Sequence, residues 1–178
     1  AIGSDVIVYP RKDRRLEKNL RTTLAKLDLV IGVSEDICQH MAAYGSCEPI
    51  CVYLGRDTDC FRRVADKTSV RRKVGIPLNC TTGIYVGHLT SMKGVEDLAE
   101  ALENVLAMHP EFRMVVVGYG VSGDSLKRVN DKVNNDAVHL VGAVDPSLVP
   151  QYLQAADFMV FPSHSEGMPQ AIIEAMNC

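Results

Sequence analysis

The stretch SEGMPQAIIE, Ser165–Glu174, holds two carboxylates eight positions apart, Glu166 and Glu174. Pro169 suits the first turn of a helix, which places Glu166 just before that helix and Glu174 inside it. A helix start presents unpaired backbone N–H groups and a partial positive charge, so it can bind a phosphate. Carboxylates would repel phosphate oxygens and are better matched to sugar hydroxyls. The spacing therefore predicts a nucleotide-sugar site.

A second loop, GHLTSMKG at residues 87–94, carries the basic groups Lys93 and His88. It follows an expected strand at 82–87, as the Glu166 loop follows one at 157–163. Ligands of doubly wound sheets bind at the carboxyl ends of strands, where the strand order reverses. If these two strands are neighbours there, Lys93 and His88 lie near Glu166. Such a cradle would hold a diphosphate without a metal.

From Cys80 onward, short apolar runs alternate with segments of helical periodicity. This alternation is typical of a doubly wound, Rossmann-like parallel α/β sheet with right-handed crossovers. Continuous apolar runs such as MVVVG fit strands that are buried on both faces. The expected strands are 82–87, 112–120, 138–142 and 157–163, and the expected helices are 93–110, 123–134, 147–156 and one that begins near Pro169.

The first sixty residues repeat the theme more loosely, with an expected helix at 14–26 and another opened by Ser34. Strands are expected at 4–9, 27–34 and 50–55. Both ends look cut, so we expect a fragment of a longer protein. The polar, Pro-terminated stretch 62–79 reads as a linker. The predicted organisation is the end of an N-terminal domain at 1–61, a linker or hinge at 62–79, and an incomplete C-terminal domain at 80–178.

Composition is that of an ordinary globular protein, with 178 residues, 47% hydrophobic residues and a net charge of −3. That charge gives no general affinity for nucleic acid. The six cysteines form no CxxC pair, so we expect reduced thiols in a cytoplasmic protein and no metal site. No apolar run approaches the length of about 20 residues that a membrane helix needs.

Several motifs, in order, resemble those of the family 4 glycosyltransferases, retaining enzymes of the GT-B type. The E-x7-E stretch, preceded by ADFMVFPSHS and followed by AMNC, is the closest match. YVGHLTSMKGVEDLAEAL is similar to the family's G-R-L…K-G-[VI] segment, and MVVVGYG to its V-G-x-G strand. VHLVGAVDPSLVPQYLQAADFMVFPS resembles its base-binding segment. LDLVIGVSEDICQHMAAYG and ICVYLGRDTDCF resemble the end of its N-terminal domain and its hinge.

This resemblance implies transfer of a hexose from a nucleotide-diphosphate sugar to a saccharide or lipid-linked acceptor, with retention of configuration and no cofactor. It implies that Glu166 contacts the hexose hydroxyls of the donor and that Glu174 accepts hydrogen bonds from the ribose. Lys93 would stabilise the leaving diphosphate, and catalysis would be largely electrostatic. The other implied donor-binding positions are Gly87, Val144, whose backbone would meet the base, Pro169, and the N–H groups of Gly167, Met168 and Gln170.

Three positions depart from the family pattern. His88 stands where the family usually has Arg beside the diphosphate, and Ile2 stands where a catalytic His is frequent. Leu54 replaces the asparagine of the family's N-G-V-D hinge motif. The basic stretch 11–21, with six Arg and Lys residues, is either a solvated face or a contact for an anionic acceptor or the inner membrane surface.

Two alternative functions remain open from the sequence. A nucleotide-sugar 2-epimerase shares the fold. A fragment that binds nucleotide without turnover is the other alternative, because the crevice of such enzymes needs both domains.

Overall fold

The computed structural model describes residues 4–45, 48–133 and 136–178, and these form two compact units. One unit contains the described residues up to Gly55 together with Ser165–Gln170. The other contains Arg56–His164 and Ala171–Cys178. The predicted domain limits at 61 and 79 stay a prediction.

The C-terminal unit is built on a four-stranded parallel sheet of strand order β5-β4-β3-β6. Ile84 of β3 pairs with Val115 of β4 on one side and with Met159 of β6 on the other. The strands are β3 (Thr82–Val86), β4 (Arg113–Val117), β5 (Val138–Gly142) and β6 (Phe158–Met159). The predicted α/β parallel fold is confirmed, and so is the placement of the first and fourth strands side by side.

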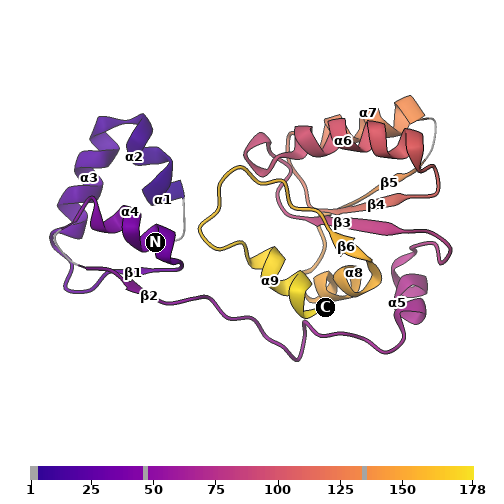
Figure 1. The fold of residues 1–178 in the computed structure, drawn as a ribbon, viewed down its shortest axis with the longest axis horizontal. Coiled ribbons are helices and arrows are strands. Elements are labelled where there is room, and N and C mark those ends of the chain that lie inside the picture. The colour runs from indigo at the N-terminus through magenta and orange to yellow at the C-terminus, as the bar shows by residue number, and fades with distance from the viewer. Residues whose placement is uncertain (1–3, 46–47, 134–135) are drawn as a thin grey trace. The chain divides into compact units, whose positions relative to one another are not determined.

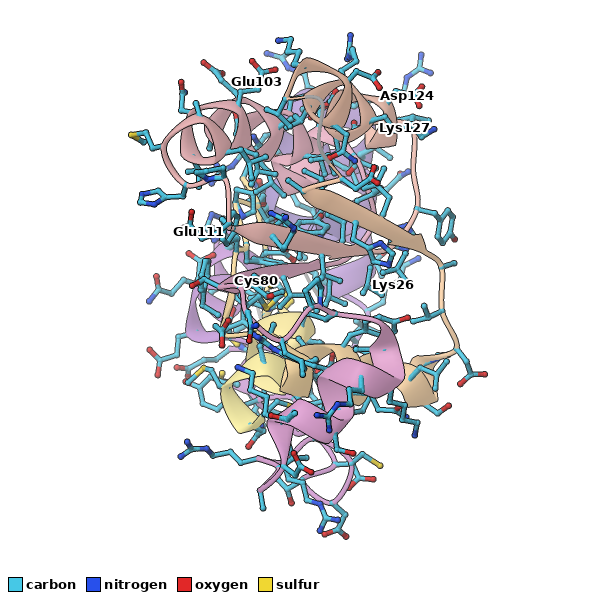
Figure 2. The ribbon with its side chains drawn as sticks, turned by 90° about the vertical axis from the view of Figure 1, so that its right-hand side faces the viewer. Lys26, Cys80, Glu103, Glu111, Asp124 and Lys127 are labelled. Atoms are coloured by element: carbon cyan, nitrogen blue, oxygen red, sulfur yellow. The ribbon has the colours of Figure 1, made fainter. Side chains whose placement is uncertain are left out.

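Helices cover both faces of this sheet, α6 and α7 on one and α5, α8 and α9 on the other (Figure 1). Their bounds are α5 (Lys67–Val74), α6 (Val95–Met108), α7 (Gly123–Val133), α8 (Val149–Ala155) and α9 (Gln170–Asn177), with 3-10 turns η1 (Ser91–Lys93) and η2 (Pro146–Leu148). On the outer surface of α6 and α7, Glu103, Asp124 and Lys127 point away from the sheet (Figure 2).

The core alternates across the sheet as the two-residue period of a strand requires. Tyr85, Met114 and Val116 pack beneath α6 and α7. Ile84 and Val115, one step along each strand, pack with α8 on the other face. Burial on both faces accounts for the continuously apolar strand sequences.

The stretch predicted as a linker contains helix α5. Asp66 caps it by accepting from the Ser69 N–H, and Gly75 ends it in the left-handed conformation with φ 73°. The buried residue of α5 is Arg71, a charged side chain with 8% exposure. Because a charged residue stands at the buried position, the helix shows no apolar stripe in the sequence.

The N-terminal unit contains α1 (Ser4–Ile7), α2 (Tyr9–Lys12), α3 (Arg14–Leu24), β1 (Ile31–Gly32), α4 (Glu35–Ala42) and β2 (Ile50–Cys51). The predicted helix at 14–26 and the Ser34 cap of the next helix are confirmed, the cap accepting from the Ile37 N–H. The strand predicted at 4–9 is wrong. Val6 is buried in the helical core of this unit, and Pro10 supports the first turn of α2, so packing overrides the β propensity of the run.

Candidate functional site

The turns that follow β3 and β4 are bonded together at the carboxyl ends of these strands. The Leu89 N–H donates to the Tyr119 carbonyl at 2.9 Å. The hydroxyl of buried Tyr85 donates to the His88 carbonyl at 2.9 Å, which fixes the backbone there. The imidazole of His88 is exposed and lies 5.1 Å from the ring of Tyr119, centroid to centroid. Two aromatic rings therefore stand together at this edge of the sheet.

A pocket of about 200 Å³ opens beside these rings. It is lined by Val86, Gly87, His88, Val117, Gly118, Tyr119, Ala143, Val144 and Val149. The pocket contains three predicted donor-site residues, Gly87, His88 and Val144. An apolar hollow with few polar groups suits a flat heterocycle such as a nucleobase.

The loop after β3 also meets the segment after β6. The His164 N–H donates to the Met92 carbonyl at 3.1 Å, and the Ser163 hydroxyl to the same oxygen at 3.4 Å. The His164 Nε2 lies 2.9 Å from Asp97 Oδ2 at the start of α6. The two turns therefore converge as far as His164, as expected from the strand order.

Gly94 permits this close approach. Its φ is 68°, a left-handed conformation that costs other residues energy, and it caps both η1 and α6. A Cβ built on Gly94 would collide with the Pro162 carbonyl. The K-G pair of the sequence is thus a requirement of the backbone as well as a source of charge.

Lys93 lies at the end of η1, and its ammonium group is 6.0 Å from the centre of the Phe161 ring, a contact within the same loop pair. Glu166 and the predicted donor-binding residues Gly167 to Gln170 group with the N-terminal unit. That Lys93 and Glu166 grip one ligand therefore stays a prediction. Ile2 lies outside the described residues.

Glu174 lies within α9, and its side chain is 15% exposed. Its Oε1 is 2.8 Å from Nε of Arg56. Burial raises the pKa of the Glu174 carboxyl above its ordinary value, and Arg56 opposes that rise only in part. Sequence analysis did not single out Arg56. Its one signal was its place in LGRD, the stretch that resembles the family hinge.

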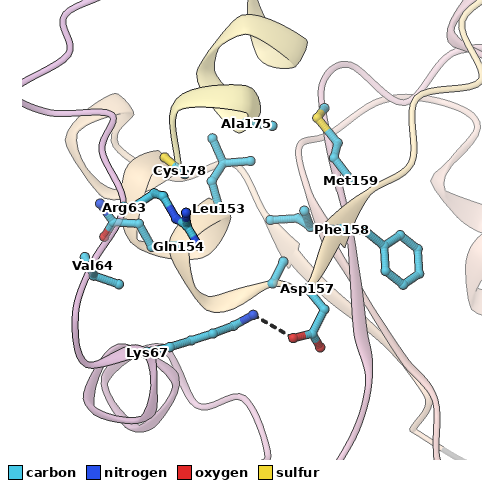
Figure 3. A pocket seen from close by; sticks show the side chains of 12 residues that line it. Arg63, Val64, Lys67, Leu153, Gln154, Asp157, Phe158, Met159, Ala175 and Cys178 are labelled. Atoms are coloured by element: carbon cyan, nitrogen blue, oxygen red, sulfur yellow. Dashed lines mark hydrogen bonds and ion pairs between the residues drawn. The ribbon is translucent and has the colours of Figure 1, made fainter.

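A second pocket of about 320 Å³ lies beside β6 (Figure 3). Asp157, at the amino end of β6, accepts from Lys67 Nζ at 2.6 Å, Arg71 Nη2 at 2.7 Å and the Thr82 N–H at 2.8 Å. Burial by itself would raise the pKa of Asp157, but these donors outweigh it and hold the pKa below the ordinary value. Lys67 and Asp157, two of the charged residues that line the pocket, pair with each other, which points to a structural role for this pair.

Among the residues that the structure describes, no three His, Cys, Asp or Glu side chains gather closely enough to hold a metal ion. None of the helices described is both long and apolar enough to cross a bilayer.

Comparison with known families and structures adds to this geometry. Residues 66–178 match the model of the family described as glycosyl transferases group 1. The chain belongs to this family. The matched region begins at the cap of α5 and includes every strand of the four-stranded sheet.

The curated relatives that this chain matches are longer than the chain itself. TuaC of Bacillus subtilis (strain 168), named as a glycosyltransferase of teichuronic acid biosynthesis, is 31% identical over 98% of this chain and 42% of its own length. D-inositol 3-phosphate glycosyltransferase 2 of Catenulispora acidiphila is 29% identical over 100% of this chain and 43% of its own. The chain thus spans less than half the length of these relatives.

Solved structures show the same fold. Sucrose-phosphate synthase from Thermosynechococcus elongatus superposes with a TM-score of 0.78 at 23% identity, over 97% of this chain and 44% of that one. Anabaena HepE, solved in complex with UDP, also gives 0.78, at 22% identity over 98% of this chain and 50% of that one. At these identities the likeness establishes the GT-B glycosyltransferase fold.

Proposed function

We propose that this chain is part of a retaining, family 4 type glycosyltransferase. The whole protein transfers a hexose from a nucleotide-diphosphate sugar to a saccharide or lipid-linked acceptor. The observation that carries the proposal is the pocket at the carboxyl ends of β3, β4 and β5, with Gly87, His88 and Val144 in its wall and the Lys93 turn bonded to the segment after β6. This is where a doubly wound sheet binds nucleotides.

The donor's parts are assigned to residues by the chemistry each offers. The base enters the apolar pocket next to the Val144 backbone, and the ribose hydroxyls donate to Glu174. In this arrangement the Arg56 guanidinium, now 2.8 Å from that carboxylate, shares it with the ribose. A carboxylate with two lone-pair-bearing oxygens can accept from both.

The reacting end of the donor lies toward Lys93 and Glu166. Lys93, His88 and the backbone N–H groups of Gly167, Met168 and Gln170 stabilise the negative charge that develops on the departing diphosphate. Glu166 accepts from the hexose hydroxyls as the sugar becomes oxocarbenium-like. Catalysis is then mainly electrostatic, through charges already in place when the bond breaks.

Nucleotide binding tests the proposal on this chain. Thermal-shift titrations with UDP-, GDP- and ADP-sugars should raise the melting temperature with at least one of them, because a ligand that binds only the folded state stabilises it. Glu174→Ala should remove the shift. Glu103→Ala is the matched control and should keep the shift. Glu103 lies on α6, and its carboxylate pairs with Lys132 of α7.

The proposal fails if no nucleotide sugar changes the melting temperature of a chain that circular dichroism shows to be folded. The metal-free donor site is tested in the same assay. A shift that survives EDTA supports it, and a shift that requires a divalent cation contradicts it.

The two alternatives differ in turnover. None of the relatives named above is an epimerase, so we do not propose epimerisation. Binding without turnover is a property of this chain that an assay can decide. Sugar release from the identified donor should be slow with this chain alone and fast with the full-length protein.

We further propose that the whole protein works at the cytoplasmic face of a membrane. Within the basic stretch 11–21, Arg21 is engaged with Glu17 and Arg11 with His40. Arg14, Arg15 and Lys18 are exposed. The fraction of protein that co-sediments with anionic vesicles should fall when Arg14, Arg15 and Lys18 are all replaced by Ala. No binding by the parent chain would leave the stretch as a solvated face.

A further inference from the structure

A pair of cysteines lies where helix α4 packs against strand β2 in the N-terminal unit. Cys38 belongs to α4 and Cys51 to β2, and both are half-buried. The proposed function uses neither of them. Their arrangement follows from the short parallel pair β1–β2 beneath the helix.

Gly32 of β1 locates the two sulfur atoms. It pairs with Cys51 across the parallel strands, so the missing side chain of Gly32 and the side chain of Cys51 belong to the same face of the pair. A Cβ built on Gly32 would lie only 2.6 Å from Cys38 Sγ. The sulfur of Cys38 therefore fills the space above Gly32, next to the side chain of Cys51.

A second contact confirms how the helix lies on the strand. Glu35 Oε1 accepts from the Tyr53 hydroxyl at 3.3 Å. Glu35 stands three residues before Cys38 on α4, and so on the same helix face. Tyr53 stands two residues after Cys51. The two pairs follow one another along the contact between helix and strand.

We propose that Cys38 and Cys51 are a reversible oxidation site that closes to a disulfide between α4 and β2. Cys38 Sγ occupies the place of a Gly32 side chain, and Gly32 is the strand partner of Cys51. Two cysteines in this arrangement are close enough for a disulfide. Burial, with the neighbouring Cys51 thiol as a further cause, raises the pKa of the Cys38 thiol. Closure should therefore accelerate as the pH rises, since the thiolate is the attacking form.

The oxidant we name is a low-molecular-weight disulfide such as oxidised glutathione. One thiolate of the pair attacks it, which forms a mixed disulfide and releases one glutathione thiolate. The second cysteine loses its proton and attacks the protein sulfur of that mixed disulfide, which expels the second glutathione. Two protein thiols are oxidised to one disulfide, and one glutathione disulfide is reduced to two glutathiones.

The crosslink should stabilise the N-terminal unit, because it restricts the unfolded chain between residues 38 and 51. The melting transition of that unit should move to higher temperature after oxidation and return after dithiothreitol. This inference is independent of the proposed function, since it concerns only thiols and stability.

Peptide mapping tests the site directly. The chain is incubated with oxidised glutathione, free thiols are alkylated, and trypsin then releases residues 27–56 as one peptide, because no Lys or Arg lies between Lys26 and Arg56. Chymotrypsin cleaves after Tyr44 and separates Cys38 from Cys51. We expect the two resulting peptides to stay joined until reduction.

Cys47 lies between the two and is the natural competitor. Cys47→Ser should keep the crosslink, and so should Cys60→Ser at an exposed cysteine. Cys38→Ser should abolish it. Alkylation of both Cys38 and Cys51 after oxidation of the Cys47→Ser chain would overturn the proposal, as would a crosslink that depends on Cys47 or Cys60. Should Cys38→Ser not fold, the Cys47→Ser chain decides alone.

Discussion

The two ends of the four-stranded sheet carry polar groups in different ways. At the amino end, Asp157 is bonded to Lys67 (Figure 3). It also accepts from Arg71 and the Thr82 N–H, so its charge is matched within the fold. At the carboxyl end, the His88 ring is exposed beside an apolar pocket.

The difference separates stability from binding. The amino end ties α5 to the sheet through charged groups that satisfy each other, which leaves little for a ligand to gain. The carboxyl end joins its loops by backbone hydrogen bonds and leaves the His88 ring exposed. Substitutions at the two ends should therefore affect different measurements.

The largest effect is expected from Asp157→Ala. It leaves Arg71, 8% exposed, without its carboxylate, and should lower the free energy of unfolding by about 2–3 kcal/mol. Asp124→Ala, at an exposed pair with Lys127, should cost less than about 0.5 kcal/mol. Urea unfolding measures both. Equal costs would show that the amino end has no special structural role.

Gly94→Ala should come next, with a loss of about 2 kcal/mol. The left-handed backbone accounts for roughly 1 kcal/mol and the collision with Pro162 for the rest. Gly75→Ala is the control, since its φ is also positive and its added Cβ meets nothing within 4 Å. Only Gly94→Ala should also weaken nucleotide binding. If both variants lose the same stability, the two loops do not depend on that close approach.

His88→Arg should strengthen nucleotide binding about threefold to tenfold at pH 8, because a guanidinium keeps its charge and binds phosphate through two N–H groups. Isothermal titration calorimetry measures the change. His109→Arg is the control and should leave nucleotide affinity unchanged. It makes the same change of charge at an exposed histidine at the end of α6, away from the pocket. Tighter binding by both variants would indicate a general charge effect.

A pH effect of defined sign should accompany Asp157. The pKa of Asp157 is lower in the folded state than its ordinary value of 3.8. Its contribution to the free energy of unfolding is therefore present above pH 3.8 and is lost as the pH falls through the folded pKa. Asp157→Asn should therefore lose less stability than the parent chain on acidification below pH 4. Parallel curves of unfolding free energy against pH would contradict this.

The smallest effect, and of opposite sign, is expected at Glu174. The pKa of Glu174 is higher in the folded state than its ordinary value of 4.5. Its contribution to the free energy of unfolding is therefore present below pH 4.5 and is lost as the pH rises through the folded pKa. Glu174→Gln should lose less stability than the parent chain as the pH rises from 4 to 7. An identical pH dependence would mean that the carboxyl is not held in a desolvated site.

Much of the C-terminal unit was predictable from its sequence. The strand at 138–142 and the neighbouring placement of β3 and β6 follow from apolar runs and from the rules of parallel topology. Topology also placed Gly87 and His88 at the carboxyl ends of the strands, where the pocket lies, whereas Val144 was named only through the family resemblance.

The features that sequence analysis missed depend on partners far along the chain. Arg71 meets Asp157 across 86 positions, and no local pattern marks a buried arginine. The helix at Ser4–Ile7 was missed because β-branched residues there are buried in a helical core. Arg56 became visible only through its bond to Glu174.

The contacts of His164 limit the positions that Glu166, a predicted catalytic residue, can occupy. The N–H and the ring of His164 hold the chain to the Met92 carbonyl and to Asp97. Glu166 follows two residues later, so chain length alone keeps its Cα within about 7 Å of that anchor. The acid is thus tethered by two residues to an anchor at the start of α6. A His164→Ala variant would remove the ring contact with Asp97 and leave the backbone bond to the Met92 carbonyl.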